Sequence, residues 1–230
     1  MQVDNTTQRS NYIREGEQIL NSLFADNSPW HKARHTIRIY QKDEYIYNVG
    51  DPSDKIYLIS EGRVKIGSLI DDDKTIVKAI FGENDLFGEM ALTGESLRID
   101  YAQATEDNTK ILSLSKEEVL EMMKVNKSLS EQIFQILGAR IRRTEKRLES
   151  LLQKDARTRI VEFLRDLALD KGKKVGFETM IKNYFTHKDM ASLTGTSRQT
   201  VTTVLNDLKD KNIINFDRRR FLIRDMELLN

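Results

Sequence analysis

The residues from 198 to 203, RQTVTT, combine a guanidinium, a primary amide and small hydroxyl groups within two helical turns. An arginine can donate two parallel hydrogen bonds to guanine, a glutamine can pair in the same way with adenine, and a threonine methyl group can touch thymine. This stretch therefore carries side chains suited to reading base edges in a major groove. The candidate base contacts are Arg198, Gln199, Thr202 and Thr203.

Two short helices are expected to position these side chains. Thr186 and Asp189 fit a capping box, so the first helix is predicted to begin at His187. Gly195 is expected to end it, because glycine readily adopts the positive φ found past a helix C-terminus. Ser197 can cap the second helix, and its hydroxyl and the helix N-terminus suit a phosphate oxygen. We include Ser197 and Thr186 among the candidate DNA contacts.

The second helix has one apolar face at helical spacing. That face consists of Val201, Val204, Leu205 and Leu208. Two helices joined by so short a connection are typical of a helix-turn-helix, whose second helix enters the major groove. An ordinary helical hairpin with a polar surface is the alternative.

Basic residues elsewhere in the C-terminal part favour the same interpretation. Two β-rich runs, 213–216 and 221–223, flank the sequence DRRR and predict a wing hairpin with Arg219 at its tip. Residues 128–230 carry a net charge of +7, whereas residues 1–127 carry −6. This asymmetry favours a polyanionic partner for the C-terminal half.

The N-terminal part shows a different pattern. Between residues 38 and 114, alternating or β-rich runs are separated by turn signals at intervals of about ten to twelve residues, which predicts a sandwich or barrel-like β roll. Short helices are expected between residues 10 and 35. The predicted fold class is α+β, with a sensor domain over 1–127, a dimerisation helix over 128–155 and a DNA-binding domain over 156–230.

Residues 115–154 are predicted to form a helix that opens with a capping box at Ser115 and Glu118. Apolar residues then recur at alternating spacings of three and four, and one threonine interrupts them. The seam consists of Phe134, Leu137, Ile141, Thr144, Leu148 and Leu151. Such a stripe must be buried, either against the chain's own β roll or against the same helix of a second subunit, and its regularity favours the parallel pair. Thr144 would fix the register or mark a place where a ligand reaches the interface.

Composition excludes several classes of site. The chain contains no cysteine, which rules out disulfides, thiol catalysis, cysteine-ligated zinc and iron–sulfur clusters. No nucleophile–base motif, phosphate-cradling glycine loop or metal-spaced cluster is present, so the protein is not expected to be an enzyme or to hold a metal. The polar N-terminus and the lack of a long apolar stretch predict a cytoplasmic protein.

Three stretches carry a resemblance that covers roughly residues 20–225. They are GDPSDKIYLISEGRVKIG (50–67), FGEMALTGE (87–95) and GTSRQTVTTVLNDLKDKNII (195–214). They resemble the CRP/FNR family of bacterial transcription regulators. The resemblance implies a cyclic-nucleotide-binding-type roll, a long dimerisation helix and a winged helix-turn-helix. It also implies a homodimer that binds a DNA operator and RNA polymerase.

The resemblance also points to an effector pocket. In members that bind a cyclic nucleotide, a Gly-Glu turn and a downstream arginine hold the ribose and the cyclic phosphate, and a threonine of the long helix reaches the base. These positions match Gly88, Glu89, Arg98 and Thr144. Ile99 replaces the expected hydroxyl residue, and Asp100 replaces a small residue and repels a phosphate if it points toward it. Glu145 stands where a serine is common in proteins that respond to cyclic AMP.

Three outcomes for this pocket stay open: a cyclic nucleotide, another small effector, or none. In the last case Glu89 and Arg98 are expected to pair with each other. Haem could be held only through His31 or His35. Gln199 and Thr203 differ from the residues common in the family, so the DNA site is expected to differ too. A sensor module with a non-DNA output is the competing function.

Overall fold

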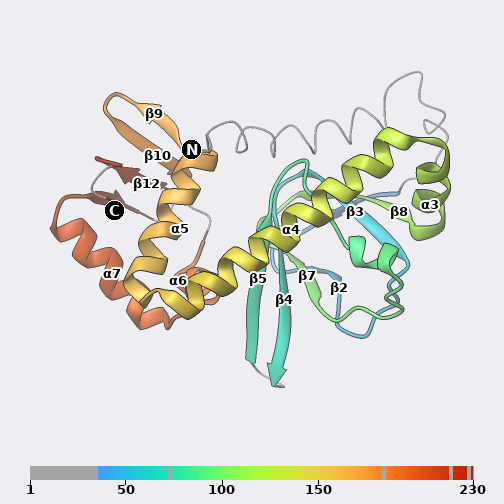
Figure 1. Ribbon diagram of the computed structural model, residues 1–230, viewed down its shortest axis with the longest axis horizontal. Helices are drawn as coiled ribbons and strands as arrows, with labels where there is room; N and C mark the ends of the chain where they lie inside the picture. The colour runs from blue at the N-terminus through green and yellow to red at the C-terminus, as the bar shows by residue number, and fades with distance from the viewer. Residues whose placement is uncertain (1–35, 72–73, 183–184, 218–219, 227–228, 230) are drawn as a thin grey trace. The chain divides into compact units, whose positions relative to one another are not determined.

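The computed structural model describes residues 36–71, 74–182, 185–217, 220–226 and 229. The chain divides into two compact units, Met1–Ile141 and Arg142–Asn230. The division falls within the longest described helix, α4 (Lys127–Gln153), which Figure 1 shows in yellow-green. The short helices expected between residues 10 and 35 lie outside the described residues, as do His31, His35 and Arg219.

The first unit is built on two four-stranded antiparallel sheets, which confirms the predicted β roll (Figure 1). The first sheet has the order β1 (Thr36–Tyr40), β8 (Thr109–Ser115), β3 (Lys55–Glu61), β6 (Leu86–Phe87). The second has the order β2 (Tyr45–Tyr47), β7 (Tyr101–Ala104), β4 (Val64–Asp71), β5 (Lys74–Phe81).

Strand β3 is buried on both of its faces, so its four central residues are all apolar or aromatic. Ile56 and Leu58 belong to a cluster that the first sheet shares with α3 (Lys116–Val125) and α4. Tyr57 and Ile59 belong to a second cluster, which also holds residues of β4 and β7 from the other sheet. Because side chains alternate along a strand, β3 contributes to two cores at once.

The single helix predicted over residues 115–154 is wrong in one respect, because the chain forms two helices there. The capping box of Ser115 and Glu118 is confirmed and starts α3. At Asn126 the backbone is extended, with φ −113° and ψ 93°. The Asn126 side-chain oxygen accepts a hydrogen bond from the Leu129 amide at 3.1 Å and so caps α4. An asparagine side chain competes with helical backbone bonds in this way, which explains the break.

The second unit packs three helices on a four-stranded sheet. The helices are α5 (Ala156–Lys171), α6 (His187–Thr194) and α7 (Arg198–Asp210). The sheet order is β11 (Ile214–Phe216), β12 (Arg220–Ile223), β10 (Glu178–Lys182), β9 (Lys173–Val175). The predicted wing is confirmed as the antiparallel pair β11–β12, with Phe216 opposite Phe221. Strands β9 and β10 were not predicted.

In the described part of the chain, no helix combines the length and the apolar character that crossing a membrane requires.

Candidate functional site

Local hydrogen bonds set both ends of the helix-turn-helix, as the sequence predicts. The Thr186 hydroxyl accepts from the Asp189 amide at 3.1 Å, and the Asp189 carboxylate accepts from the Thr186 amide at 2.8 Å. Helix α6 therefore begins at His187. The Ser197 hydroxyl accepts from the Thr200 amide at 3.0 Å and caps α7 in the same manner.

The turn between α6 and α7 requires a glycine for two reasons. Gly195 has φ +62°, in the left-handed region that residues with a side chain rarely adopt. A β-carbon at this position would also lie 2.3 Å from Cδ2 of Leu151, near the end of α4. Leu151, predicted only as a dimer residue, therefore packs on the turn of its own chain.

The first turns of α7 expose most of the predicted base contacts. The side chains of Arg198, Gln199 and Thr203 are exposed, as is that of Ser197. The opposite face of the helix is apolar and buried. It consists of the predicted set Val201, Val204, Leu205 and Leu208, which is confirmed. A capped, rigidly packed helix thus presents a guanidinium, an amide and a hydroxyl to solvent.

Thr202 is less exposed than the other three predicted base contacts on α7. Its side chain is half-buried. Its hydroxyl donates to the Arg198 carbonyl at 3.0 Å and lies 2.8 Å from Nδ1 of His187. The imidazole of the preceding helix covers Thr202, because His187 begins α6 beside the second turn of α7. Sequence periodicity gave no sign of this contact.

Arg159 fastens the helix-turn-helix to the end of α4. Its guanidinium donates to the carbonyls of Thr194 and Gly195, at 2.8 and 2.9 Å, and to the carbonyl of Lys154 at 2.6 Å. Arg147 of α4 donates to the Ser192 carbonyl of α6, and burial lowers the pKa of its guanidinium. Both arginines satisfy carbonyls at the C-terminal end of α6, where the helix leaves acceptors without partners.

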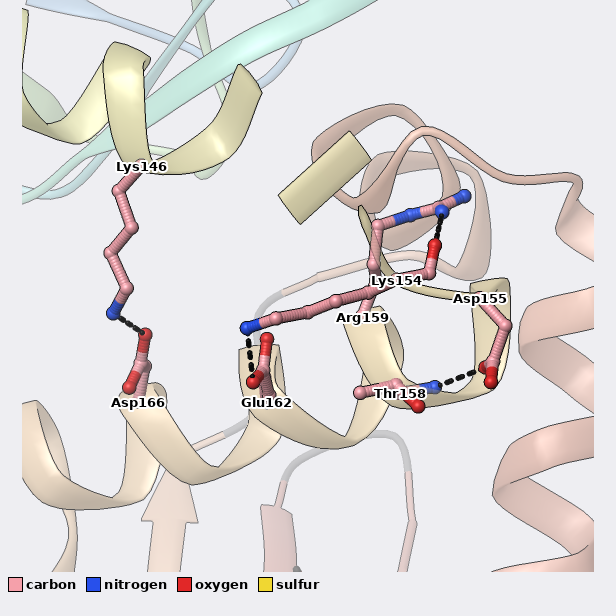
Figure 2. A network of polar contacts seen from close by, with 7 residues as sticks. All are labelled: Lys146, Lys154, Asp155, Thr158, Arg159, Glu162 and Asp166. Atoms are coloured by element: carbon pink, nitrogen blue, oxygen red, sulfur yellow. Dashed lines mark hydrogen bonds and ion pairs between the residues drawn. The ribbon is translucent and has the colours of Figure 1, made fainter. Parts of the chain in front are cut away.

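Ion pairs also join α4 to α5, as Figure 2 shows. Lys146 lies 3.1 Å from Asp166, and Lys154 lies 2.6 Å from Glu162. Asp155 stands at the junction of the two helices, and its carboxylate caps α5 by accepting from the Thr158 amide at 2.8 Å. The sequence pattern gave no partner for the basic residues of α4. The structure places several of them in contacts within the second unit.

In the first unit, Glu89 has a partner that the sequence did not reveal. Glu89 follows Gly88 (φ +75°), opens the 3-10 helix η2 (Glu89–Thr93), and is 4% exposed. Its carboxylate forms an ion pair with Arg140 of α4. The Arg140 guanidinium also donates to the Leu86 carbonyl and lies over the ring of Phe81, 4.6 Å from its centre. A buried ion pair therefore ties α4 to the roll.

The expected pairing of Glu89 with Arg98 does not occur. Arg98 is 2% exposed, and its guanidinium donates to the carbonyls of Gly88 (3.0 Å) and Lys55. It also lies over the ring of Tyr47, 4.5 Å from the centre. Its Nε has no hydrogen-bond partner among the described residues. Stacking and backbone carbonyls, rather than a carboxylate, hold this buried cation.

Asp100 adds a negative charge beside Arg98. Burial raises the pKa of the Asp100 carboxyl, while Lys78, Tyr47 and Arg98 each act in the opposite direction. Burial, and then the Asp100 charge, raise the pKa of the Tyr47 hydroxyl. Ile99, between Arg98 and Asp100, points an apolar side chain into solvent.

Several of these residues depart from the cyclic-nucleotide site that the resemblance implies. Glu89, which would accept the ribose hydroxyl, is already bound to Arg140. Arg98, which would hold the phosphate, bonds to backbone carbonyls, and the neighbouring Asp100 would repel an anion. Ile99 offers no hydrogen bond in place of the expected hydroxyl. Thr144 is exposed on α4.

The predicted seam of α4 divides into two sets. Phe134, Ile141 and Leu148 are 66%, 60% and 57% exposed, although each is large and apolar. Leu137 is half-buried and packs against the core of the roll. Residues seven apart along α4 therefore form an apolar stripe that the chain itself leaves open to solvent.

A β roll of this topology, followed by a long helix and a winged helix-turn-helix with an exposed polar recognition helix, defines a DNA-binding regulator with a sensor-type domain. Residues 37–126 match the model of the cyclic nucleotide-binding domain, and residues 158–230 match that of the Crp-like helix-turn-helix domain. The chain belongs to the CRP/FNR family of transcription regulators.

The chain is similar to named relatives along most of its length. It is 30% identical to the cyclic AMP receptor protein of Thermus thermophilus over 194 residues, 84% of this chain and 85% of that one. It is 29% identical to the global nitrogen regulator of a Nostoc species over 81% of this chain and 84% of that one. The structure of a CooA mutant from Carboxydothermus hydrogenoformans matches with TM-score 0.79 and 26% identity, covering 92% of this chain and 93% of that one.

Proposed function

We propose that this regulator acts as a homodimer in which two copies of α4 pair through the exposed stripe Phe134, Ile141 and Leu148. Three large apolar side chains at heptad spacing are costly to leave in water, and a second copy of the same helix would cover them. The pair would place two copies of α7 on successive major grooves, about 34 Å apart.

The residues that contact DNA are proposed to be those at the start of α7 and around it. Arg198, Gln199 and Thr203 would read bases, because their side chains are exposed on the first two turns. Thr186 and Ser197 would lie near phosphates, and Arg219 would contact the backbone from the wing. Thr202 is reassigned to a supporting role beneath His187. The observation that carries the proposal is the exposed polar face of α7 on a fully capped helix-turn-helix.

Replacing Arg198 by alanine is expected to weaken specific DNA binding by about 1–3 kcal/mol, or roughly 5- to 150-fold, because a bidentate contact to guanine is lost. The measurement is titration of a duplex that the wild-type protein has enriched from a random-sequence library. Arg38→Ala removes one exposed positive charge from the other unit and serves as the matched control. Equal affinity of Arg198→Ala and Arg38→Ala for this duplex would show that Arg198 does not read a base.

The signal is proposed to act at the junction of the roll and α4. One relative is named a cyclic AMP receptor protein and another a global nitrogen regulator, so family membership alone does not decide the effector. An effector can favour one arrangement of the helices only through its differential affinity for that arrangement. The ion pair of Glu89 and Arg140 is the described contact that such an effector would have to accommodate.

Cyclic AMP is expected not to bind tightly, since Glu89 is engaged and Asp100 opposes a phosphate. Isothermal titration calorimetry of the purified protein should show no saturable heat at concentrations of about 100 µM, a free energy weaker than about −5.5 kcal/mol. A cyclic AMP-binding relative in the same buffer is the control. A micromolar dissociation constant for this protein would overturn the interpretation of the pocket.

RNA polymerase is the further partner that we propose, because a transcription regulator bound at an operator acts on the enzyme at the promoter. A cytoplasmic location follows from the proposed DNA target.

A further inference from the structure

We propose that His187 is a proton-dependent contact to a DNA phosphate, so that the affinity of this regulator for DNA rises as the pH falls. The proposal rests on the proposed DNA-binding function and adds a regulatory property to the same surface. It depends on the hydrogen bonds of one imidazole that joins the two helices of the helix-turn-helix.

The hydrogen bonds around Thr202 determine which imidazole nitrogen carries the proton. A threonine hydroxyl has one hydrogen to donate, and here it goes to the Arg198 carbonyl at 3.0 Å. With the hydroxyl hydrogen used in this way, we assign the 2.8 Å contact between this hydroxyl and Nδ1 of His187 to donation by Nδ1–H. The neutral imidazole then carries its lone pair on Nε2, which has no hydrogen-bond partner in the described part of the chain.

This tautomer allows His187 to gain a proton without losing a contact. The Nδ1–H···Oγ1 bond to Thr202 is made by both the neutral and the charged ring. Protonation adds an N–H at Nε2 and one positive charge, both of which suit a phosphate oxygen. The imidazole of His187 lies beside the recognition helix, and the preceding residue, Thr186, is exposed. The positive charge of the protonated ring would therefore be added to the surface proposed to face DNA.

The charged groups around His187 oppose its protonation in the free protein. Burial and the positive charge of Arg198 on α7 both lower the pKa of the imidazole. On its own helix, Lys188 is a second cation, and the Asp189 carboxylate is held by the Thr186 amide and hydroxyl at 2.8 and 2.7 Å. From β11, the neighbouring group is the ring of Phe216, over which Lys209 lies at 5.4 Å.

A nearby DNA phosphate would favour protonation of His187 instead of opposing it. Its negative charge favours the imidazolium and offsets the repulsion from Arg198, so the pKa of His187 in the complex is raised above its value in the free protein. The complex then binds more protons than its separate components at pH values between the two pKa values. By linkage, affinity for DNA increases as the pH falls through that window and is constant well above it.

The test measures DNA affinity from about pH 8 to about pH 6 at constant ionic strength, with a duplex that the protein has enriched from a random-sequence library. The affinity of the wild-type protein for this duplex is expected to rise roughly 3- to 10-fold over this range for each contact between His187 and a phosphate. The slope of log affinity against log salt concentration should also steepen by about 0.9 for each additional phosphate contact.

Two variants distinguish a proton-dependent phosphate contact by His187 from a purely structural role of this residue. His187→Gln removes the titratable group, and its affinity and salt slope should be the same at both pH values. His35→Gln, which changes a histidine of the other unit, should behave as wild type. Retention of the wild-type pH dependence by His187→Gln, or a flat wild-type profile on a duplex that is bound specifically, would overturn the proposal. Failure to enrich any duplex at any pH would instead argue against the proposed DNA-binding function.

Discussion

Replacing Arg140 by glutamine is expected to lower the free energy of unfolding of the N-terminal unit by about 3–5 kcal/mol. The variant leaves the Glu89 carboxylate, which is 4% exposed, without the cation that offsets the cost of its burial. Glutamine is shorter than arginine, so the hydrogen bond to the Leu86 carbonyl is lost together with the charge. Urea denaturation followed by far-ultraviolet circular dichroism measures the effect.

Two further variants show whether the loss of stability comes from the ion pair between Glu89 and Arg140. The double variant Glu89→Gln/Arg140→Gln should be more stable than Arg140→Gln alone, because no unpaired charge then remains in the roll. Arg142→Gln changes an exposed arginine of the same helix and should shift the unfolding free energy by less than about 0.5 kcal/mol. If Arg140→Gln is as stable as Arg142→Gln, the ion pair does not hold α4 on the roll.

Replacing Ile141 by glutamate is expected to separate the two subunits. In the proposed dimer the substitution buries two facing carboxylates at the centre of the stripe, which costs several kcal/mol and weakens self-association by about 100-fold or more. In one chain Ile141 is 60% exposed, so the fold of each subunit should be unaffected. Sedimentation velocity gives the oligomeric state. Affinity for the enriched duplex should fall in parallel, because a single subunit reaches only one half-site.

Gln135→Glu is the matched control for this experiment. It adds the same charge to an exposed position of α4 outside the seam, and it should leave both self-association and DNA binding unchanged. A monomeric wild-type protein, or an Ile141→Glu protein that stays dimeric, would contradict the proposed pairing of α4.

The features predicted well from sequence are those with local causes. Thr186, Asp189, Gly195 and Ser197 act on backbone groups within three or four residues, so their spacing alone indicates where α6 begins and ends and where α7 begins. The alternation in the roll likewise predicts strands, because each strand must bury a face. The break at Asn126 was missed because the apolar pattern continues across it, and only its amide cap marks the boundary.

The features that could not be predicted depend on contacts between distant segments. Arg140 lies about fifty positions from Glu89, and as an off-seam basic residue it resembles any solvated charge. The same is true of His187 and Thr202, where an imidazole of α6 contacts and partly covers a predicted base contact on α7. In both cases the residue types were visible in the sequence, whereas their partners are set by how the elements pack.

The contacts of Arg147, Leu151 and Arg159 have a consequence for how a signal could travel. Together they attach the last two turns of α4 to the carbonyls and the glycine at the turn of the helix-turn-helix. The last two turns of α4 and the recognition helix should therefore move as one rigid body, without bending at the junction near Asp155. Any hinge that reorients the recognition helix therefore lies upstream, in the stretch of α4 before Arg147.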